Sequence, residues 1–397
     1  MLVYEFKVKA KTEQYQAIDE AIRIGQFLRN KCLRYWMDSK KEDKVNGFAL
    51  NKYTKVLADN KEEFPFVSRL NSMARQASAE RAWCAISRFF DNCKKKINGK
   101  KGFPKFKKNS RSIEYKTSGW KLSENRKYLT ITDKTGIKTL KLIGTNDVHF
   151  YQIKQIKRVR LLRKVDGYYA QFCIAQERLE DCSVTNNHLG LDVGLESFYT
   201  DSKGKKVENP RFLRKSDKKL KRLQRSLSKK KKGSKNRKKA QKRLGKQHLK
   251  VSRQRKDWVV KLARWVMKSN DFVAIEDLNV KGLVKNHHLA KSINDASWSL
   301  FREWLEYFGK IFQRELIAVP PQYTSQDCSS CGKRVKKSLK TRTHICECGL
   351  VVCRDHNAAI NILEKALDVV GHTESLNACG QINLCVTNEN LSDKLAG

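Results

Sequence analysis

The sequence has no apolar run long enough to cross a bilayer, and its charged start, MetLeuValTyrGluPheLysValLys, does not resemble a signal peptide. We therefore expect a cytoplasmic protein that binds no membrane. Hydrophobic residues still make up 40% of the 397 residues, which is enough for two or three domains with cores of their own.

Acidic residues are scarce relative to basic ones. The chain has 84 Lys and Arg against 41 Asp and Glu, a formal net charge of +43. Such self-repulsion calls for a polyanion that neutralises it, and nucleic acid is the expected partner. An acidic membrane surface is the alternative, and the lack of an apolar span argues against it.

The twelve cysteines are unevenly spread, because several of them crowd into one short stretch near the C-terminus. This crowding favours metal binding over disulfides in a cytosolic chain. Cys328-Ser-Ser-Cys331-Gly and Cys346-Glu-Cys348-Gly resemble two knuckles that would hold one structural Zn²⁺ with no open coordination position. The second knuckle has one residue fewer than usual, so Cys353 or His344 could replace a ligand, and free thiols are the alternative.

The apolar pattern divides the chain into segments. A short alternating stretch at the N-terminus is followed, from about residue 12 to 96, by apolar residues at helical spacing, among them Ile18, Ile22 and Ile86. Gly and Pro interrupt this block at residues 99 to 106, and β-like runs continue to residue 177. A helical insert therefore interrupts a β domain, and the first strand should pair with the later ones.

From about residue 186 onward, strands and helices alternate, which predicts a mixed α/β layer. Its most basic part, residues 212 to 256, reads as two helices joined by a turn that contains Lys229, Lys230, Lys231 and Lys232, with Arg237 just beyond. We expect these five residues to contact phosphates, because charges of one sign would otherwise repel one another. A solvated charged hairpin is the alternative.

Three carboxylates stand where a strand ends or a helix begins: Asp192 in LeuGlyLeuAspValGly, Glu276 in PheValAlaIleGluAspLeuAsn, and Asp355 in ArgAspHisAsnAlaAlaIleAsnIle. Acids at the edge of a buried sheet are costly unless they bind metal. Two divalent ions held by such a set can activate water and stabilise the leaving oxygen of a phosphodiester, so the pattern predicts a metal-dependent nuclease. Any one of them alone could instead be a capping or surface acid.

These motifs, together with TyrThrSerGlnAspCysSerSerCysGly and the basic hairpin, resemble TnpB, the RNA-guided endonuclease of bacterial insertion sequences, and the related miniature type V CRISPR effectors. The resemblance covers the whole chain and is strongest from residue 186 to 363. It implies that Asp192, Glu276 and Asp355 are the catalytic ligands of two Mg²⁺ ions. Many family members have Asp where this chain has Cys353, and the second, catalytic acid of that motif is retained as Asp355.

The resemblance also implies a domain layout. A β-barrel wedge domain would comprise residues 1–10 and 99–185, with a helical recognition domain at 11–98. A ribonuclease-H-like RuvC nuclease domain would comprise 186–324 and 350–366, with a zinc ribbon inserted at 325–349. Residues 367–397 read as a disordered tail.

The implied function is RNA-guided cleavage of DNA next to a short target-adjacent motif, by a transposon-associated enzyme. Its partners would be a guide RNA and double- and single-stranded target DNA, and it would join the bacterial nucleoid when bound to DNA. For motif reading we propose Tyr53, with Asn71, Arg75 and Gln76 on a helix over residues 68 to 78. An ordinary polar helix face explains the last three residues equally well.

Two other functions are compatible with such a chain. An RNA-guided DNA-binding repressor with a silent nuclease is the first, and the intact acidic triad argues against it. A transposase of the single-strand type is the second, but it requires two histidines separated by one hydrophobic residue. None of the eight histidines stands two positions from another, so this chemistry is excluded.

Overall fold

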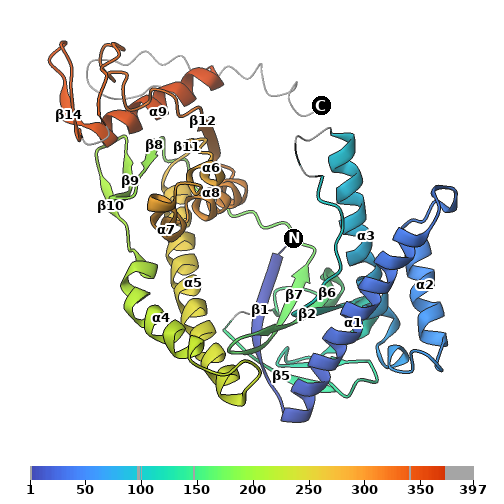
Figure 1. Cartoon of the computed structure of the whole chain (residues 1–397). Coiled ribbons are helices and arrows are strands. Elements are labelled where there is room, and N and C mark those ends of the chain that lie inside the picture. The colour runs from blue at the N-terminus through green and yellow to red at the C-terminus, as the bar shows by residue number, and fades with distance from the viewer. Residues whose placement is uncertain (1, 96–98, 100, 146–147, 339–340, 372–397) are drawn as a thin grey trace. The chain divides into compact units, whose positions relative to one another are not determined.

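The computed structural model describes the chain except for residues 1, 96–98, 100, 146–147, 339–340 and 372–397. It divides into two compact units, Met1–Arg178 and Leu179–Gly397 (Figure 1). This division lies seven residues before the domain boundary predicted at 185. Residues 179 to 185 belong to the second unit because the Glu180 N–H donates to the Ile311 carbonyl at 2.9 Å and the Thr185 N–H to Asp271 Oδ2 at 2.9 Å.

The first unit contains a seven-stranded antiparallel sheet in the order β2-β6-β7-β1-β5-β4-β3. The N-terminal strand β1 lies inside it, paired with β5 and β7, which confirms that the first strand pairs with later ones. The seven strands are β1 (Leu2–Lys9), β2 (Ser112–Lys116), β3 (Trp120–Leu122), β4 (Tyr128–Ile131), β5 (Thr139–Ile143), β6 (Ile156–Lys164) and β7 (Gly167–Ile174).

Three long helices are inserted between β1 and β2, as the apolar spacing predicted: α1 (Thr12–Asp38), α2 (Gly47–Asp59) and α3 (Ser72–Lys94). Ile18 and Ile22 of α1 are buried in the core that the sheet also lines, while Ile86 packs in a smaller cluster shared by the three helices. Helix α1 approaches β2 so closely that a Cβ on Gly25 would lie 2.4 Å from Ile113 Cδ1.

The second unit is built on a five-stranded sheet in the order β10-β9-β8-β11-β12, in which β8, β11 and β12 are parallel. Alternate residues of β11 face two cores. Val273 and Ile275 pack with α5 and α8, whereas Phe272 and Ala274 pack with α9. The strands are β8 (His188–Val193), β9 (Ser197–Asp201), β10 (Lys206–Glu208), β11 (Phe272–Glu276) and β12 (Glu315–Val319).

Helices cover this sheet and extend from it (Figure 1). The basic hairpin consists of α4 and α5, but α5 does not end at 256. Its last turns carry Val259, Ala263 and Val266, which are fully buried in the core. The helices are α4 (Phe212–Ser228), α5 (Lys235–Ser269), α6 (Val280–Leu283), α7 (His287–Ala296), α8 (Trp298–Phe312) and α9 (Arg354–Val370).

A two-stranded hairpin of β13 (Thr343–Ile345) and β14 (Val351–Cys353) carries the second knuckle, so the ribbon region extends beyond its predicted end at 349. Helix α9 starts directly after it and runs to Val370, four residues past the predicted end of the nuclease domain at 366. The rest of the predicted tail, residues 372–397, lies outside the described residues. In the part of the chain that is described, no helix combines the length and the apolarity needed to span a membrane.

Candidate active site and metal centre

Asp192 and Glu276 lie at the carboxyl ends of two neighbouring parallel strands. In the register of β8 and β11, Leu191 pairs with Ile275, so the next residue on each strand is one of the two acids. Both side chains are half-buried. The carboxyl edge of parallel strands is where α/β sheets place their binding residues, so the predicted pairing of these two acids follows from the sheet itself.

Asp355 reaches the same edge because α9 packs against β8. The approach is so close that a Cβ on Gly190 would lie 2.1 Å from the Ala359 carbonyl oxygen, which explains the glycine in LeuGlyLeuAspVal. Asp192 is two residues beyond Gly190 on the same face of the strand, about 7 Å away. Asp355 is four residues before Ala359, about 6 Å along the helix axis. The first turn of α9 therefore brings Asp355 towards Asp192.

The electrostatics of Asp192 reflect this arrangement. Burial raises its pKa well above the ordinary value of 3.8, and the negative charges of Glu276 and Asp355 raise it further, while Arg354 opposes them. Burial also raises the pKa of Glu276, against a hydrogen bond from Thr324 and the charge of Lys365. A divalent cation would stabilise the charged forms of Asp192 and Glu276, so these carboxylates, with Asp355 beside them, are a suitable donor set for one.

The carboxylates are adjacent but not tightly gathered. Of the described residues, only four cysteines form a group in which three or more metal-binding atoms all lie within 4.8 Å of one another. An open acidic site agrees with the chemistry of Mg²⁺, which keeps several water ligands and takes only some of its oxygens from the protein.

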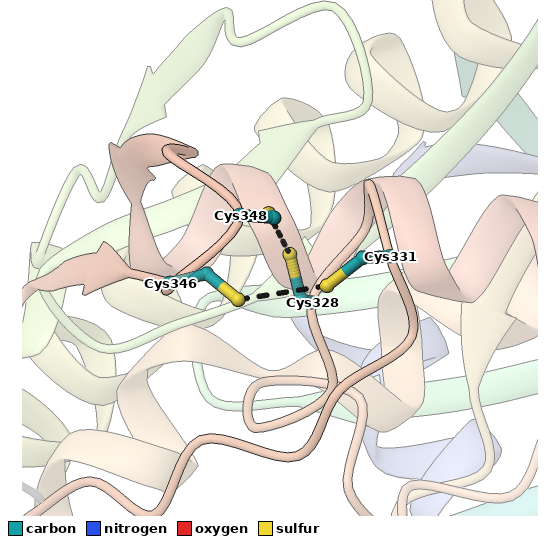
Figure 2. Close-up of side chains that lie close together, drawn as sticks. All are labelled: Cys328, Cys331, Cys346 and Cys348. Carbon is teal, nitrogen blue, oxygen red and sulfur yellow. Dashed lines mark hydrogen bonds between the residues drawn. The ribbon is translucent and has the colours of Figure 1, made fainter.

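Those four cysteines are Cys328, Cys331, Cys346 and Cys348 (Figure 2). The Sγ atoms of Cys328 and Cys348 are 3.7 Å apart, and those of Cys331 and Cys346 are 3.6 Å apart. A tetrahedral Zn²⁺ with Zn–S bonds of about 2.3 Å requires S–S distances of about 3.8 Å. The short second knuckle therefore fits a four-thiolate zinc site.

The two alternative zinc ligands lie outside the group of four sulfurs. His344 is fully buried, its Nδ1 contacts the ammonium of Lys337, and its side chain also hydrogen-bonds Cys328 without joining the group. The Cys353 side chain hydrogen-bonds Lys206 and thereby raises the pKa of that lysine. The geometry thus favours the set of four cysteines over any set that includes His344 or Cys353.

Buried asparagines connect α9 to the first knuckle. Asn357 donates to the Asp327 carbonyl at 2.7 Å and accepts from the Ser329 N–H at 3.0 Å. Asn361 donates to the carbonyls of Thr324 and Asp327, both at 2.7 Å. Thr324 in turn donates its hydroxyl hydrogen to Glu276 Oε1 at 2.5 Å.

None of the predicted motifs included these hydrogen bonds. The signal for them in the sequence is a pair of asparagines four residues apart on the apolar face of a helix, where amides need partners.

The five hairpin residues predicted to contact nucleic acid differ in their exposure. Lys229, Lys230, Lys231 and Lys232 are exposed at the turn between α4 and α5. Arg237 is instead half-buried, and its Nη1 donates to the carbonyls of Leu227 at 3.1 Å and Lys230 at 2.8 Å. Its role in the structure is to close the turn, which leaves the four lysines as the candidate phosphate contacts.

The predicted motif-reading residues are also partly engaged. Helix α3 starts at Ser72 rather than 68, because Asn71 is its N-cap and accepts from the Ala74 N–H at 2.9 Å. Asn71 also donates to the Gly119 carbonyl, and Arg75 donates to the Leu70 carbonyl at 2.8 Å. Tyr53, on α2, stacks on Tyr35 with ring centroids 4.4 Å apart. Gln76 remains half-exposed.

Comparison with known proteins agrees with these features. Residues 171–287 match the family OrfB_IS605, described as a probable transposase, and residues 298–362 match the Cas12f1-like TNB domain. A putative RNA-guided DNA endonuclease of Streptomyces pristinaespiralis is 28% identical over 95% of this chain and 90% of its own length. The putative RNA-guided DNA endonuclease InsQ of Escherichia coli K12 is 27% identical over 57% of this chain and 59% of its own.

The fold is similar to that in the solved Cas12f1–sgRNA–target DNA complex, with a TM-score of 0.53 and 16% identity over 88% of this chain and 81% of that one. These matches confirm the resemblance that the motifs predicted. The chain is related to TnpB, of the insertion sequences, and to the miniature Cas12f effectors.

Proposed function

We propose that this protein is a transposon-associated, RNA-guided, Mg²⁺-dependent DNA endonuclease that cuts DNA beside a short target-adjacent motif. The observation that supports this most is the convergence of Asp192, Glu276 and Asp355 at one edge of a sheet, with the pKa of Asp192 raised by the other two. The relatives named RNA-guided DNA endonucleases support the same activity.

In this proposal the three carboxylates would hold two Mg²⁺ ions, and the chemistry that such ions supply when bound would be activation of a water and stabilisation of the leaving oxygen of the phosphodiester. The parallel strands β8 and β11 orient Asp192 and Glu276. The close packing of α9 on Gly190 fixes the position of Asp355 along the sheet edge. The Thr324 hydroxyl fixes one oxygen of Glu276, so the other is available to a ligand.

The remaining parts of the molecule would bind nucleic acid or stabilise the nuclease site. The seven-stranded sheet and its inserted helices would form the wedge and recognition domains that hold the guide RNA, with Tyr53 and Gln76 as candidate motif readers. The exposed lysines of the α4–α5 turn would contact phosphates of the guide RNA or of its hybrid with DNA. The four cysteines would hold one Zn²⁺ that supports the loop carrying Thr324.

The test is to express the gene with its native flanking DNA and to sequence the RNA that copurifies. Purified complex is then incubated with plasmids that carry the matching target next to randomised flanking bases, with Mg²⁺ or with EDTA. We expect double-strand cuts that need Mg²⁺ and select one short flanking motif. Stable, guide-dependent binding with no cut at any Mg²⁺ concentration would contradict the proposal and favour a repressor with a silent nuclease.

A further inference from the structure

In the first unit, a segment at residues 105–110 that is neither helix nor strand, here called the strap, is fixed along helix α1. The Asn30 amide donates to the Lys107 carbonyl at 2.9 Å and accepts from the Lys107 N–H at 2.9 Å. Gln26 accepts from the Ser110 N–H at 2.6 Å, and Arg29 Nη1 donates to the Lys105 carbonyl at 3.1 Å. Because helix side chains hold its backbone, the strap presents its own side chains from a fixed position.

An open cavity of about 540 Å³ is lined by the strap, α1, α3 and the start of β2. Its charged lining consists, within the described residues, of five bases and no acid: Arg29, Arg81, Arg88, Lys107 and Arg111. The rest of the lining is small or polar, and includes Cys84, Ala85, Asn109, Ser110 and Ser112. Such a concentration of like charge in a cavity attracts an anion.

Two of these bases are held at the floor of the cavity. Arg29 is only 8% exposed, and it donates hydrogen bonds to two neutral oxygens, those of Lys105 and Asn30. Burial lowers the pKa of Arg29, and the charge of Arg81 lowers it further. A buried guanidinium beside a second one is an unfavourable arrangement unless an anion joins them.

Arg81 does have an acidic partner, but that acid is shared. Arg81 Nη2 is 3.3 Å from Glu114 Oε2, and its Nη1 donates to the Ser112 carbonyl. The same Glu114 carboxylate also accepts from Arg158 at 2.6 Å and from Arg160 at 2.9 Å. Glu80 also pairs with Arg158 at 3.0 Å, but it is shared with Lys116. Two acids therefore serve three arginines and a lysine, and a surplus of positive charge remains behind the cavity.

We propose that this cavity binds a phosphodiester group of a nucleic-acid backbone, with Arg29 and Arg81 as fixed donors and Arg88, Lys107 and Arg111 at the rim. Forked guanidinium groups match the geometry of phosphate oxygens. That the anion is part of a nucleic acid rests on the proposed function. The phosphate can come from the guide RNA or from DNA.

A second basic cavity favours a polymer over a small anion. It measures about 440 Å³ and is lined by Arg23, Lys31, Arg34 and the strap residue Phe106, among others. Phe106 is exposed, and the Arg34 guanidinium carbon lies over its ring, 5.3 Å from the ring centroid. The basic side chains of the two cavities can contact the phosphates of a nucleic acid, and the exposed aromatic ring can stack on a nucleobase.

The test measures binding of a fluorescein-labelled single-stranded RNA of mixed sequence, and of DNA of the same sequence, to the full chain in EDTA at several salt concentrations. The variant Arg88→Gln/Arg111→Gln removes two exposed rim charges. We expect weaker binding and a slope of log K against log salt that is shallower by about 0.7, the value for one phosphate contact on a single strand. Loss with RNA alone or with DNA alone supports the site and identifies the source of the phosphate, and loss with both supports a site that accepts either backbone.

The matched control is Lys52→Gln/Lys55→Gln, which removes the same charge from exposed positions on α2. We expect it to change binding much less. An equal loss in the two double variants would mean that only net charge matters, and this would overturn the proposal.

Arg29→Met tests the floor of the cavity. We expect weaker binding with little change in Tm without nucleic acid, because losing the hydrogen bond to Lys105 is offset by removing a buried charge. A lower Tm with unchanged binding would make Arg29 a purely structural residue and contradict its role. A cavity that binds as proposed in a protein that never cuts DNA would contradict the proposed function and leave this inference standing.

Discussion

The second unit has two candidate metal sites that differ in how complete they are. The four cysteine sulfurs lie within 4.8 Å of one another and nearly match the edges of a zinc tetrahedron. The three carboxylates approach one edge of the sheet without gathering as closely, and Glu276 and Asp355 each raise the cost of ionising Asp192. The cysteine site is thus closed, as structural zinc sites are, because four protein ligands would fill the coordination of the metal. The carboxylate site is open, as catalytic metal sites are, and leaves coordination positions for water and substrate.

The two sites are also mechanically connected. Asn357 and Asn361 hold the loop that leads to the first knuckle, and Thr324 in that loop holds Glu276. The cysteine site can therefore affect catalysis through position, although none of its residues need touch the substrate.

The largest expected effect is at the open site. Asp192→Ala, Glu276→Ala or Asp355→Ala should each lower the cleavage rate by about 1,000-fold or more, because losing a ligand removes several kcal/mol of charge stabilisation in the transition state. Guide and target binding, measured in parallel, should be unchanged. Asp277→Ala is the matched control, since this exposed neighbour of Glu276 pairs with Arg302 instead. Rapid cleavage by any one of the three variants would exclude that residue from the site.

Mutations at the cysteine site should affect metal content and stability first. Cys346→Ser should lose the single Zn²⁺, measured by elemental analysis, and lower the Tm of the second unit, because metal binding contributes directly to folding. Cys353→Ser should keep the metal, since the Cys353 side chain contacts Lys206. Zinc-free protein that is soluble, stable and active would contradict a structural zinc site.

The features that the sequence analysis located best are those that short motifs encode. Asp192, Glu276 and Asp355 each follow or precede an apolar run, and the sheet register then brings two of them together without further information. The cysteine knuckles are similarly local. Such features depend on a few neighbouring residues, which the sequence displays directly.

The features that it misplaced depend on distant partners. Asn71 looked available for base reading, but its amide is used by Ala74 and by Gly119, which is far along the chain. Arg237 looked like a phosphate contact, but it closes the α4–α5 turn. The end of α5 was obscured because its basic face continues past 256 while the opposite face enters the core. Polar side chains have many possible partners, and only the fold selects among them.

A smaller effect is expected where the two sites meet. Thr324→Val should raise the Mg²⁺ concentration for half-maximal cleavage by about 10-fold or more, the usual cost of removing a hydrogen bond to a metal ligand. Thr324→Ser keeps the hydroxyl and should behave like wild type. If the Val and Ser variants have the same Mg²⁺ dependence, the bond to Glu276 does not orient that carboxylate.

The smallest effect, and the most specific to the open site, is on stability without metal. Because the pKa of Asp192 is raised in the folded protein, its contribution to stability is fully present below its ordinary pKa of 3.8 and is lost as the pH rises through the folded value. Asp192→Asn cannot ionise, so in EDTA its Tm should be close to that of wild type in acid and higher by a few degrees at neutral pH. Each pKa unit corresponds to about 1.4 kcal/mol, and 1 kcal/mol shifts the Tm of a unit of this size by about 2–4 °C.

Mg²⁺ should reverse the order of the two proteins at neutral pH, because it stabilises the wild-type carboxylates and has one ligand fewer in the variant. Thermal unfolding of both proteins across this pH range, with and without Mg²⁺, measures the difference directly. A Tm difference that does not change with pH would show that Asp192 ionises as easily in the folded protein as in the unfolded chain. In that case its two acidic neighbours would be too far away to share a metal with it, and the open site would not be the catalytic one.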